Sequence, residues 1–399
     1  MELAASFGHT VSGSDRDLLG HDPKNVTGSD LVVYTNAVKQ DNCELKEAKK
    51  LGIKTVERAE FLGDLSRLYD KCVAVSGCHG KSTSTAMTGA ALEFLSPTVH
   101  VGALGASKIG GRDIFVTEAC EYNKSFHFLS PDIGVVLNVA YDHPDFYKTE
   151  AELKSAYLKF IKNSETPLVN GDDPYLSKTG GISFGLEKNN FYRAEKLSSK
   201  NGLYSFDFTA GGKKLARAEL SVHGKHNVYN ALAALSVSHL LDVPMDSAIA
   251  AIKNFGGIAR RFEYLGKAHG KAVYSDYAHH PDEITATITA AHEIYKSVAV
   301  VFQPHTYSRT AALFKETAAA LYSAETVILA PIYAAREKQI EGISSEIITD
   351  ELFMLGKCAD LASSLDEAAN IAINAGAEAV IFMGAGDVTK AAEKFMTKN

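Results

Sequence analysis

The stretch Val73-Ala74-Val75-Ser76-Gly77-Cys78-His79-Gly80-Lys81-Ser82-Thr83 decides how the rest of the chain is interpreted. An apolar run typical of a buried strand leads into a turn with two glycines and then into a helical pattern. Such a turn points backbone N–H groups inward, and the helix N-terminus that follows favours negative charge. The stretch therefore predicts a phosphate-binding loop, in which Lys81 neutralises the β- and γ-phosphates and the Ser82 hydroxyl binds magnesium.

This loop departs from the pattern G-x-x-x-x-G-K-[ST] at one position, because Val75 stands where the first glycine belongs. A glycine-rich turn without function is the alternative. The buried strand before the loop and the helix predicted from about Ser82 to Leu95 favour a nucleotide triphosphate site. The predicted ATP site includes Gly77, Cys78, His79, Gly80, Lys81, Ser82 and Thr83.

Two further side chains follow predicted strands and are candidates for the metal site. Glu118 comes after the strand-like Ile114–Thr117, and His143 comes after Ile133–Asn138 in the loop Asp142-His143-Pro144-Asp145. The carboxyl ends of parallel strands lie at one edge of a sheet, so both side chains are expected near the phosphate loop. Read alone, each would be an ordinary solvated loop residue. With Ser82 they form the predicted magnesium set.

Outward from this loop, β-branched runs alternate with helical patterns, which is typical of α/β domains with parallel sheets. Residues 188–218 contain Gly-Gly turns and alternating residues, which predict an antiparallel excursion. Breaks near Leu68 and Phe255 divide the chain into three domains, 1–68, 69–255 and 256–399. The fold class is thus α/β, with a truncated Rossmann-like N-terminal domain, a central P-loop ATPase-like domain and a C-terminal Rossmann-like domain.

Composition excludes several classes of protein. The 399 residues carry a net charge of -7, which argues against a nucleic-acid or acidic-membrane partner. The five cysteines are scattered and never form a CxxC pair, as expected of reduced cysteines in a cytoplasmic protein. No apolar run reaches the ~20 residues that cross a bilayer, and Met1 to Asp15 lacks the features of a signal peptide. The oligomeric state stays open.

The motifs taken together resemble those of the Mur ligase family over nearly the whole chain. Besides the phosphate loop, they are Glu118-Ala119-Cys120-Glu121-Tyr122, Asp142-His143-Pro144-Asp145-Phe146-Tyr147, His223-Gly224-Lys225-His226-Asn227-Val228-Tyr229-Asn230-Ala231, Arg260-Arg261-Phe262-Glu263, Asp276-Tyr277-Ala278-His279-His280-Pro281 and Phe302-Gln303-Pro304-His305-Thr306-Tyr307-Ser308-Arg309-Thr310. The resemblance implies an ATP- and Mg2+-dependent ligase with small-molecule substrates, UDP-N-acetylmuramate and L-alanine. ATP would convert a carboxylate into an acyl phosphate, which the amine of an amino acid then attacks.

The resemblance also assigns roles to single residues. Catalysis would depend on Lys81, Glu118, His143 and Arg309, and magnesium on Ser82, Glu118 and His143. The adenosine end of ATP would meet His226, Asn230 and Asp276. The amino-acid and acyl-phosphate end would meet Arg261, Tyr277, His279, His305 and Arg309.

Some of these residues have plainer interpretations. Arg260 or Arg261 would suit a hinge ion pair. Tyr277 would suit simple packing. His280 precedes Pro281 at a predicted helix start and is interpreted as a helix cap rather than a catalyst.

Departures from the family bear mainly on the N-terminus. The family normally opens with a strand, a Gly-rich loop and a helix that cradle the UDP diphosphate, whereas this chain begins inside that helix, at Glu2–Phe7. Either the true start lies upstream or the protein is a degenerate copy. Cys78 replaces a threonine in the phosphate loop, and Thr306 stands where an arginine is usual.

Two alternative functions follow from these observations. One is the recycling ligase that joins a murein tripeptide to the same nucleotide sugar. The string from Asp142 to Tyr147 and the compact third domain favour L-alanine over the tripeptide. The other is a remnant that binds ATP without ligating, which the missing UDP loop favours and the intact Lys81, Glu118 and His143 oppose.

Overall fold

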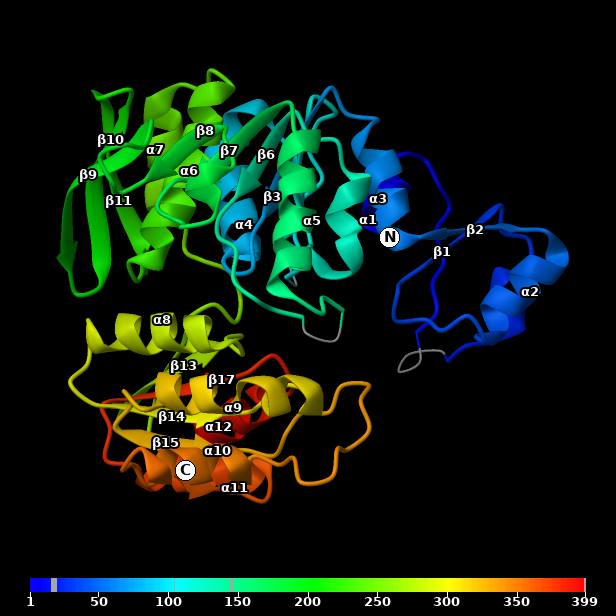
Figure 1. The fold of residues 1–399 in the computed structure, drawn as a ribbon. Coiled ribbons are helices and arrows are strands. Elements are labelled where there is room, and N and C mark those ends of the chain that lie inside the picture. The colour runs from blue at the N-terminus through cyan, green and yellow to red at the C-terminus, as the bar shows by residue number, and fades with distance from the viewer. Residues whose placement is uncertain (16–19, 104, 144–145, 398–399) are drawn as a thin grey trace.

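A computed structural model describes residues 1–15, 20–103, 105–143 and 146–397. Pro144 and Asp145 of the predicted metal loop lie outside the described residues. Three sheets follow one another along the chain, and one falls within each of the three proposed domains, 1–68, 69–255 and 256–399 (Figure 1). The predicted class, three consecutive α/β units, is confirmed. Among the described residues no helix has the length and apolar content to span a membrane.

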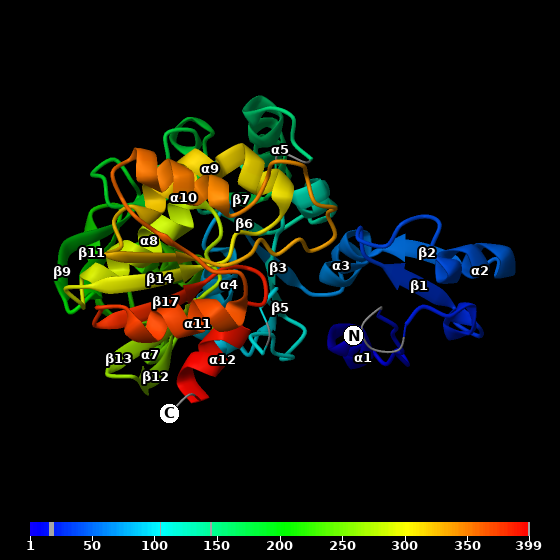
Figure 2. The same ribbon diagram turned by 90° about the horizontal axis from the view of Figure 1, so that it is seen from below.

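The N-terminal sheet has two strands, β1 (Leu31–Tyr34) and β2 (Lys54–Glu57), which pair in parallel. The helix α2 (Cys43–Leu51) connects them. It begins after Asn42, whose side chain accepts hydrogen bonds from the first turn, and ends at Gly52 in the left-handed conformation. β1, β2 and α2 extend to one side of the molecule (Figure 2).

Two helices of this domain lie on the central domain instead. α1 (Glu2–Ser6) and α3 (Arg58–Ser66) bring Leu3 and Leu62 against a core cluster of the central domain. The N-terminal domain is therefore anchored by its helices while its sheet projects from the molecule.

The central sheet is the largest. Its strands are β3 (Lys71–Ser76), β4 (Thr98–His100), β5 (Ile114–Glu118), β6 (Ile133–Val136), β7 (Thr166–Asn170), β8 (Ile182–Gly185), β9 (Tyr192–Lys200), β10 (Leu203–Ala210) and β11 (Lys213–His223). Their order is β11-β10-β9-β8-β7-β6-β3-β5-β4. Only the β9–β10 and β10–β11 pairs are antiparallel, which confirms the excursion predicted for 188–218.

Alternate residues of β3 face two different cores, as the period of two in a strand requires. Val73 and Val75 join a cluster with α4 (Lys81–Ala91), α6 (His226–Leu240) and α7 (Met245–Asn254). Cys72 and Ala74 join a second cluster with α5 (Glu150–Asn163). Because both faces are covered, β3 is buried and its carboxyl end is held rigidly. The predicted helix from Ser82 to Leu95 is shorter than expected, since α4 ends at Ala91 and a 3-10 turn, Glu93–Leu95, follows.

The C-terminal sheet has the order β12-β13-β17-β14-β15-β16, and only β12–β13 is antiparallel. The strands are β12 (Glu263–Ala268), β13 (Lys271–Asp276), β14 (Val298–Phe302), β15 (Thr326–Leu329), β16 (Asp360–Leu361) and β17 (Ala379–Met383). The helices are α8 (Pro281–His292), α9 (Tyr307–Leu321), α10 (Glu346–Met354), α11 (Leu365–Asn374) and α12 (Thr389–Thr397). α8 lies on the side of this domain that faces the central domain (Figure 1).

Replacing Phe160 tests the core beneath α5. Its side chain is fully buried and stacks on Phe126, with the ring centroids 5.1 Å apart. We expect Phe160→Ala to lower the free energy of unfolding by about 3–5 kcal/mol, because the lost ring leaves a cavity. Phe353→Ala on α10 is the control, since that ring is 70% exposed. Calorimetry that finds equal losses for the two variants would contradict this core assignment.

Candidate active site

The phosphate loop is the turn between β3 and α4. Gly80 has φ 80° and Gly77 has φ 147°, conformations that favour glycine. A Cβ at Gly80 would lie 2.9 Å from Asn230 Oδ1, so α6 approaches the loop too closely for a side chain there. The loop is also tied to the segment after β6, since the His79 N–H donates to Asn138 Oδ1 at 2.9 Å. The predicted Asn230 thus lies directly against the phosphate loop.

Lys81 is held at this loop by a buried carboxylate that the sequence analysis missed. Its Nζ donates to the carbonyls of Gly77 (2.6 Å) and Cys78 (3.1 Å) and to Glu121 Oε1 at 3.0 Å. The Glu121 side chain is only 1% exposed. Burial opposes both charges, but each lowers the cost of the other: Glu121 raises the pKa of Lys81, and Lys81 lowers the pKa of Glu121. The sequence did offer one indication of this residue, because Glu121 is the second acidic residue in the motif Glu118-Ala119-Cys120-Glu121-Tyr122.

The predicted magnesium set is divided between two neighbouring groups. Ser82 Oγ donates to Glu118 Oε2 at 2.9 Å. His143 instead lies 3.4 Å from Glu121 Oε1 and 3.7 Å from Asp142 Oδ2, measured from its Nε2. Magnesium prefers oxygen ligands. The hydroxyl of Ser82 and the carboxylates of Glu118 and Glu121, gathered at the start of α4, therefore fit Mg2+ by their chemistry.

Arg309 connects the C-terminal domain to the metal loop. Its Nη2 donates to Asp142 Oδ1 at 2.8 Å, and both side chains are nearly buried, at 11% and 6% exposure. Burial alone would raise the pKa of Asp142, but Arg309 and His143 hold it well below its usual range. A permanently ionised pair therefore places the predicted catalytic arginine beside His143.

The other predicted substrate residues lie in a continuous series of contacts that leads to Arg309. The ring of Tyr277 lies 5.1 Å from the guanidinium carbon of Arg261. His279 Nδ1 contacts the Tyr277 carbonyl at 3.0 Å, and its ring lies 5.6 Å from that of His305. His305 Nδ1 is 3.4 Å from Arg309 Nη1. Burial lowers the pKa of His279 to about 3 and that of His305 to about 4, so both imidazoles are neutral at pH 7.

Two of the residues predicted to meet adenosine, His226 and Asp276, lie in different surroundings. His226, the first residue of α6, is neutral because burial and Arg261 lower its pKa to about 4. Asp276 ends β13, and its carboxylate accepts the N–H groups of Phe262 (2.6 Å) and Ala278 (2.7 Å). Burial raises the pKa of Asp276 to about 6. The Asp276 side chain therefore fixes the backbone at Phe262 and at Ala278 by hydrogen bonds.

His280 is the helix cap that the sequence predicted. Its side chain accepts the Asp282 N–H, and Glu283 accepts the His280 N–H to complete a capping box at the start of α8. Glu283 also lies within 3.4 Å of His279 Nδ1 and 3.6 Å of Arg261 Nη1. Glu283, with a side chain that is 12% exposed, is a second carboxylate of the site that sequence reasoning missed.

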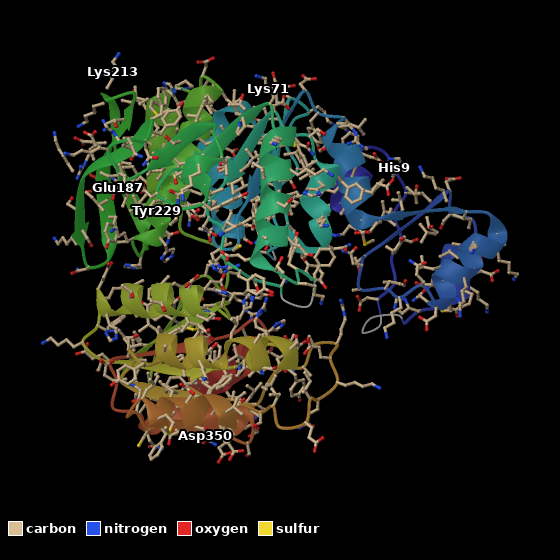
Figure 3. All side chains as sticks on the ribbon, in the orientation of Figure 1. His9, Lys71, Glu187, Lys213, Tyr229 and Asp350 are labelled. Carbon is tan, nitrogen blue, oxygen red and sulfur yellow. The ribbon has the colours of Figure 1, made fainter. Side chains whose placement is uncertain are left out.

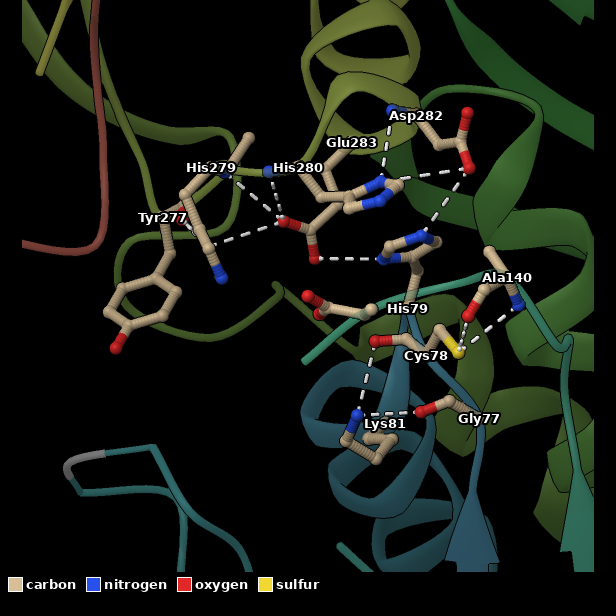
Figure 4. Close-up of polar contacts among 12 residues, drawn as sticks. Gly77, Cys78, His79, Lys81, Ala140, Tyr277, His279, His280, Asp282 and Glu283 are labelled. Carbon is tan, nitrogen blue, oxygen red and sulfur yellow. Dashed lines mark hydrogen bonds and ion pairs between the residues drawn. The ribbon is translucent and has the colours of Figure 1, made fainter. Parts of the chain in front are cut away.

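His79 extends from the phosphate loop toward α8 (Figure 4). Its Nδ1 lies 3.4 Å from Glu283 Oε1, its Nε2 lies 3.5 Å from Asp282 Oδ2, and its ring contacts His280. Burial alone would lower the pKa of His79, but Asp282 and Glu283 raise it to about 9. His79 is therefore an imidazolium at neutral pH that links two domains.

This pairing predicts a pH dependence of stability. The His79 pKa is about 9 in the folded protein against about 6.5 in an unfolded chain, so its contribution is complete below pH 6.5 and is lost as the pH rises to 9. We expect the stability difference between the wild type and His79→Gln to shrink by at most about 3 kcal/mol across this window. Thermal unfolding from pH 6 to 10 measures it. A difference that stays constant or grows would contradict the assignment.

Three family models match the chain in consecutive segments. The model described as "Mur ligase family, catalytic domain" matches residues 1–70. The Mur ligase middle domain matches residues 75–238. The "Mur ligase, glutamate ligase domain" matches residues 260–386. Together they include strands of all three sheets of the structure.

Curated relatives align over essentially the whole chain. The UDP-N-acetylmuramate–L-alanine ligase of Caldicellulosiruptor saccharolyticus is 38% identical over an alignment of 433 positions, gaps included, which covers 100% of this chain and 95% of that protein. The ligase of the same name from Clostridium novyi is 40% identical, over 99% of this chain and 93% of that protein.

Solved structures share the same architecture. The UDP-N-acetylmuramate–alanine ligase of Thermotoga maritima matches with a TM-score of 0.81 and 28% identity, over 99% of this chain and 89% of that one. A murein peptide ligase from Psychrobacter arcticus matches with a TM-score of 0.69 over 99% of this chain and 94% of that one. At 20% identity, that likeness concerns the fold alone. From the full-length relatives and the three consecutive domain matches, the chain belongs to the Mur ligase family.

Proposed function

We propose that this protein is an ATP-dependent ligase that joins L-alanine to the lactyl carboxylate of UDP-N-acetylmuramate in the synthesis of peptidoglycan precursors. The substrates are those named for relatives that are 38% and 40% identical over nearly the full chain. One observation carries the chemistry: Arg309 pairs with Asp142, and the next residue, His143, lies 3.4 Å from Glu121, the carboxylate that holds Lys81.

The first step transfers the γ-phosphoryl group of ATP to a carboxylate oxygen, which yields an acyl phosphate and ADP. The N–H groups of the phosphate loop and the Lys81 ammonium hold the transferring oxygens and balance their charge. Ser82, Glu118 and Glu121, with His143 beside them, are the residues proposed to hold Mg2+, which when bound would supply positive charge that offsets the charge of the phosphates.

The second step forms the amide bond. The amine nitrogen of L-alanine attacks the acyl carbon, the C–O bond to phosphate breaks, phosphate leaves with that electron pair, and the nitrogen loses a proton to the departing phosphate. Arg309 is suited to clamp the carboxylate of the amino acid bidentately or to neutralise charge on the phosphoryl group. His279 and His305 are neutral, so they can hydrogen-bond the amino acid without adding charge.

ADP release tests the proposal. The purified chain is assayed with ATP, Mg2+, UDP-N-acetylmuramate and L-alanine, and each component is omitted in turn. We expect release to require both the nucleotide sugar and L-alanine. Release with a murein tripeptide but not with L-alanine would replace the proposal by the recycling ligase. ATP binding without release, even after a relative's Gly-rich UDP loop is added, would indicate a non-catalytic protein.

A further inference from the structure

Three potential metal ligands meet where the phosphate loop touches α8. They are His79 of the central domain and His280 and Asp282 of the C-terminal domain, and one ligand atom of each lies within 4.8 Å of the others. In the part of the chain that the structure describes, this is the only such group of three His, Cys, Asp or Glu residues. We infer that His79, His280 and Asp282 form a transition-metal site of the zinc type that bridges the two domains.

The spacing of these atoms suits a tetrahedral ion. Ligands bound about 2.0–2.2 Å from a tetrahedral zinc lie about 3.3–3.6 Å from one another. Asp282 Oδ2 is 3.5 Å from His79 Nε2 and 3.7 Å from His280 Nδ1. Two edges of the ligand triangle therefore already have nearly the length that zinc requires, and the ligand atoms of the two histidines lie within 4.8 Å of each other.

The two imidazoles present suitable nitrogens. His280 Nδ1 accepts the N–H of Asp282 over a long 3.4 Å, a weak cap hydrogen bond whose lone pair a metal ion would take over, and burial lowers the pKa of this side chain, which keeps it neutral. His79 Nε2 is buried and has no hydrogen-bond partner among the described residues. Without a metal ion, a proton on His79 Nε2 faces the negative charge of Asp282 Oδ2 at 3.5 Å. A bound metal ion would replace that proton.

Glu283 provides the outer support that metal-bound histidines usually have. Its Oε1 lies 3.4 Å from His79 Nδ1, the nitrogen that faces away from Asp282. A carboxylate in this position fixes the ring and increases the basicity of the nitrogen that binds the metal. Figure 4 shows Glu283 and Asp282 on opposite sides of the His79 ring.

The composition and exposure of the site determine which ion it would take. Two nitrogens and one carboxylate oxygen favour Zn2+ and its neighbours in the first transition series over Mg2+, which prefers oxygen alone. The Asp282 side chain is 64% exposed, whereas His280 is 8% exposed, so a fourth position opens to water on the side of Asp282. A bound ion would fasten the phosphate loop to α8.

Binding of Co2+ to the full chain, in the presence of excess Mg2+, tests the site. Co2+ replaces Zn2+ and reports its ligands by visible absorption. We expect one Co2+ per chain, displaced by Zn2+, with nitrogen and oxygen ligation. Asp282→Asn and His280→Asn should each raise the dissociation constant at least tenfold. Asparagine at position 280 keeps an N-cap acceptor, so α8 should still form.

Asp246→Asn is the matched control, because Asp246 is the second residue of α7 as Asp282 is of α8. It should leave Co2+ affinity unchanged. As a second readout, Zn2+ should raise the melting temperature of the wild type and the control but not that of the Asp282 or His280 variant. Affinity that is unchanged in both site variants, thiolate absorption from a cysteine ligand, or no binding would each overturn the inference.

Discussion

Lys81→Met is expected to lower kcat/KM for ADP release by roughly three orders of magnitude. Removing one preorganised group that stabilises transition-state charge costs about 10²–10³-fold, and Lys81 also neutralises Glu121. The methionine leaves that carboxylate buried at the phosphate loop without its ammonium partner. We therefore expect weaker ATP binding in addition to slower turnover, measured by calorimetric titration and by the ADP assay.

Lys71→Met provides the matched control. Lys71 is the first residue of β3 and lies at the opposite end of that strand from the phosphate loop, on the surface (Figure 3). Its replacement should leave both measurements within twofold of the wild type. If Lys81→Met kept more than a tenth of the activity, the loop would not be the site of phosphoryl transfer.

Glu121→Gln is expected to have the second largest effect, a loss of about 10²-fold or more in kcat. The amide keeps the size of the side chain but removes the charge that faces Lys81 and His143. A buried lysine that loses its counter-ion is destabilised, and a proposed magnesium ligand is lost at the same time. The ADP assay over a range of Mg2+ concentrations should show a raised Mg2+ requirement.

Glu93→Gln controls for the loss of one carboxylate. Glu93 is 57% exposed and pairs with Lys108 at the surface. This change should leave the Mg2+ dependence unaltered, since surface ion pairs contribute about 0–1 kcal/mol. A wild-type Mg2+ requirement in Glu121→Gln would show that Glu121 serves only to balance Lys81.

Local patterns predicted much of this architecture. The strands predicted at Ile114–Thr117 and Ile133–Asn138 appear as β5 and β6, and the helix predicted from about Ser82 begins at Lys81 as α4, because strand and helix periodicity act over short distances. The strand, loop and helix around Lys81 also follow from local chemistry. His280 as a helix cap belongs to the same class of prediction.

The candidate site was predicted less completely because its contacts are distant in sequence. Asp142 and Arg309 are separated by 167 residues, and no periodicity indicates that they pair. Glu118 and Glu121 could not be distinguished by pattern, since both follow the same strand. In the structure, Glu118 contacts Ser82 from the end of β5, while Glu121 reaches Lys81 from the turn beyond it.

The contact between the central and C-terminal domains includes pairs of opposite charge and no shared hydrophobic cluster among the described residues, which makes domain separation during turnover sensitive to salt. Within the described residues, no hydrophobic cluster contains residues from both domains. The Arg309–Asp142 pair and the pairs of His79 with Asp282 and Glu283 join opposite charges across this contact. Ions in solution screen exposed charges over about 8–10 Å at moderate ionic strength but screen a nearly buried pair such as Arg309–Asp142 much less, so the screening acts on these charges once the domains separate. Salt concentration should therefore shift the balance between association and separation of these domains, and buffers of different ionic strength should change the rate of product escape before they change the chemical step.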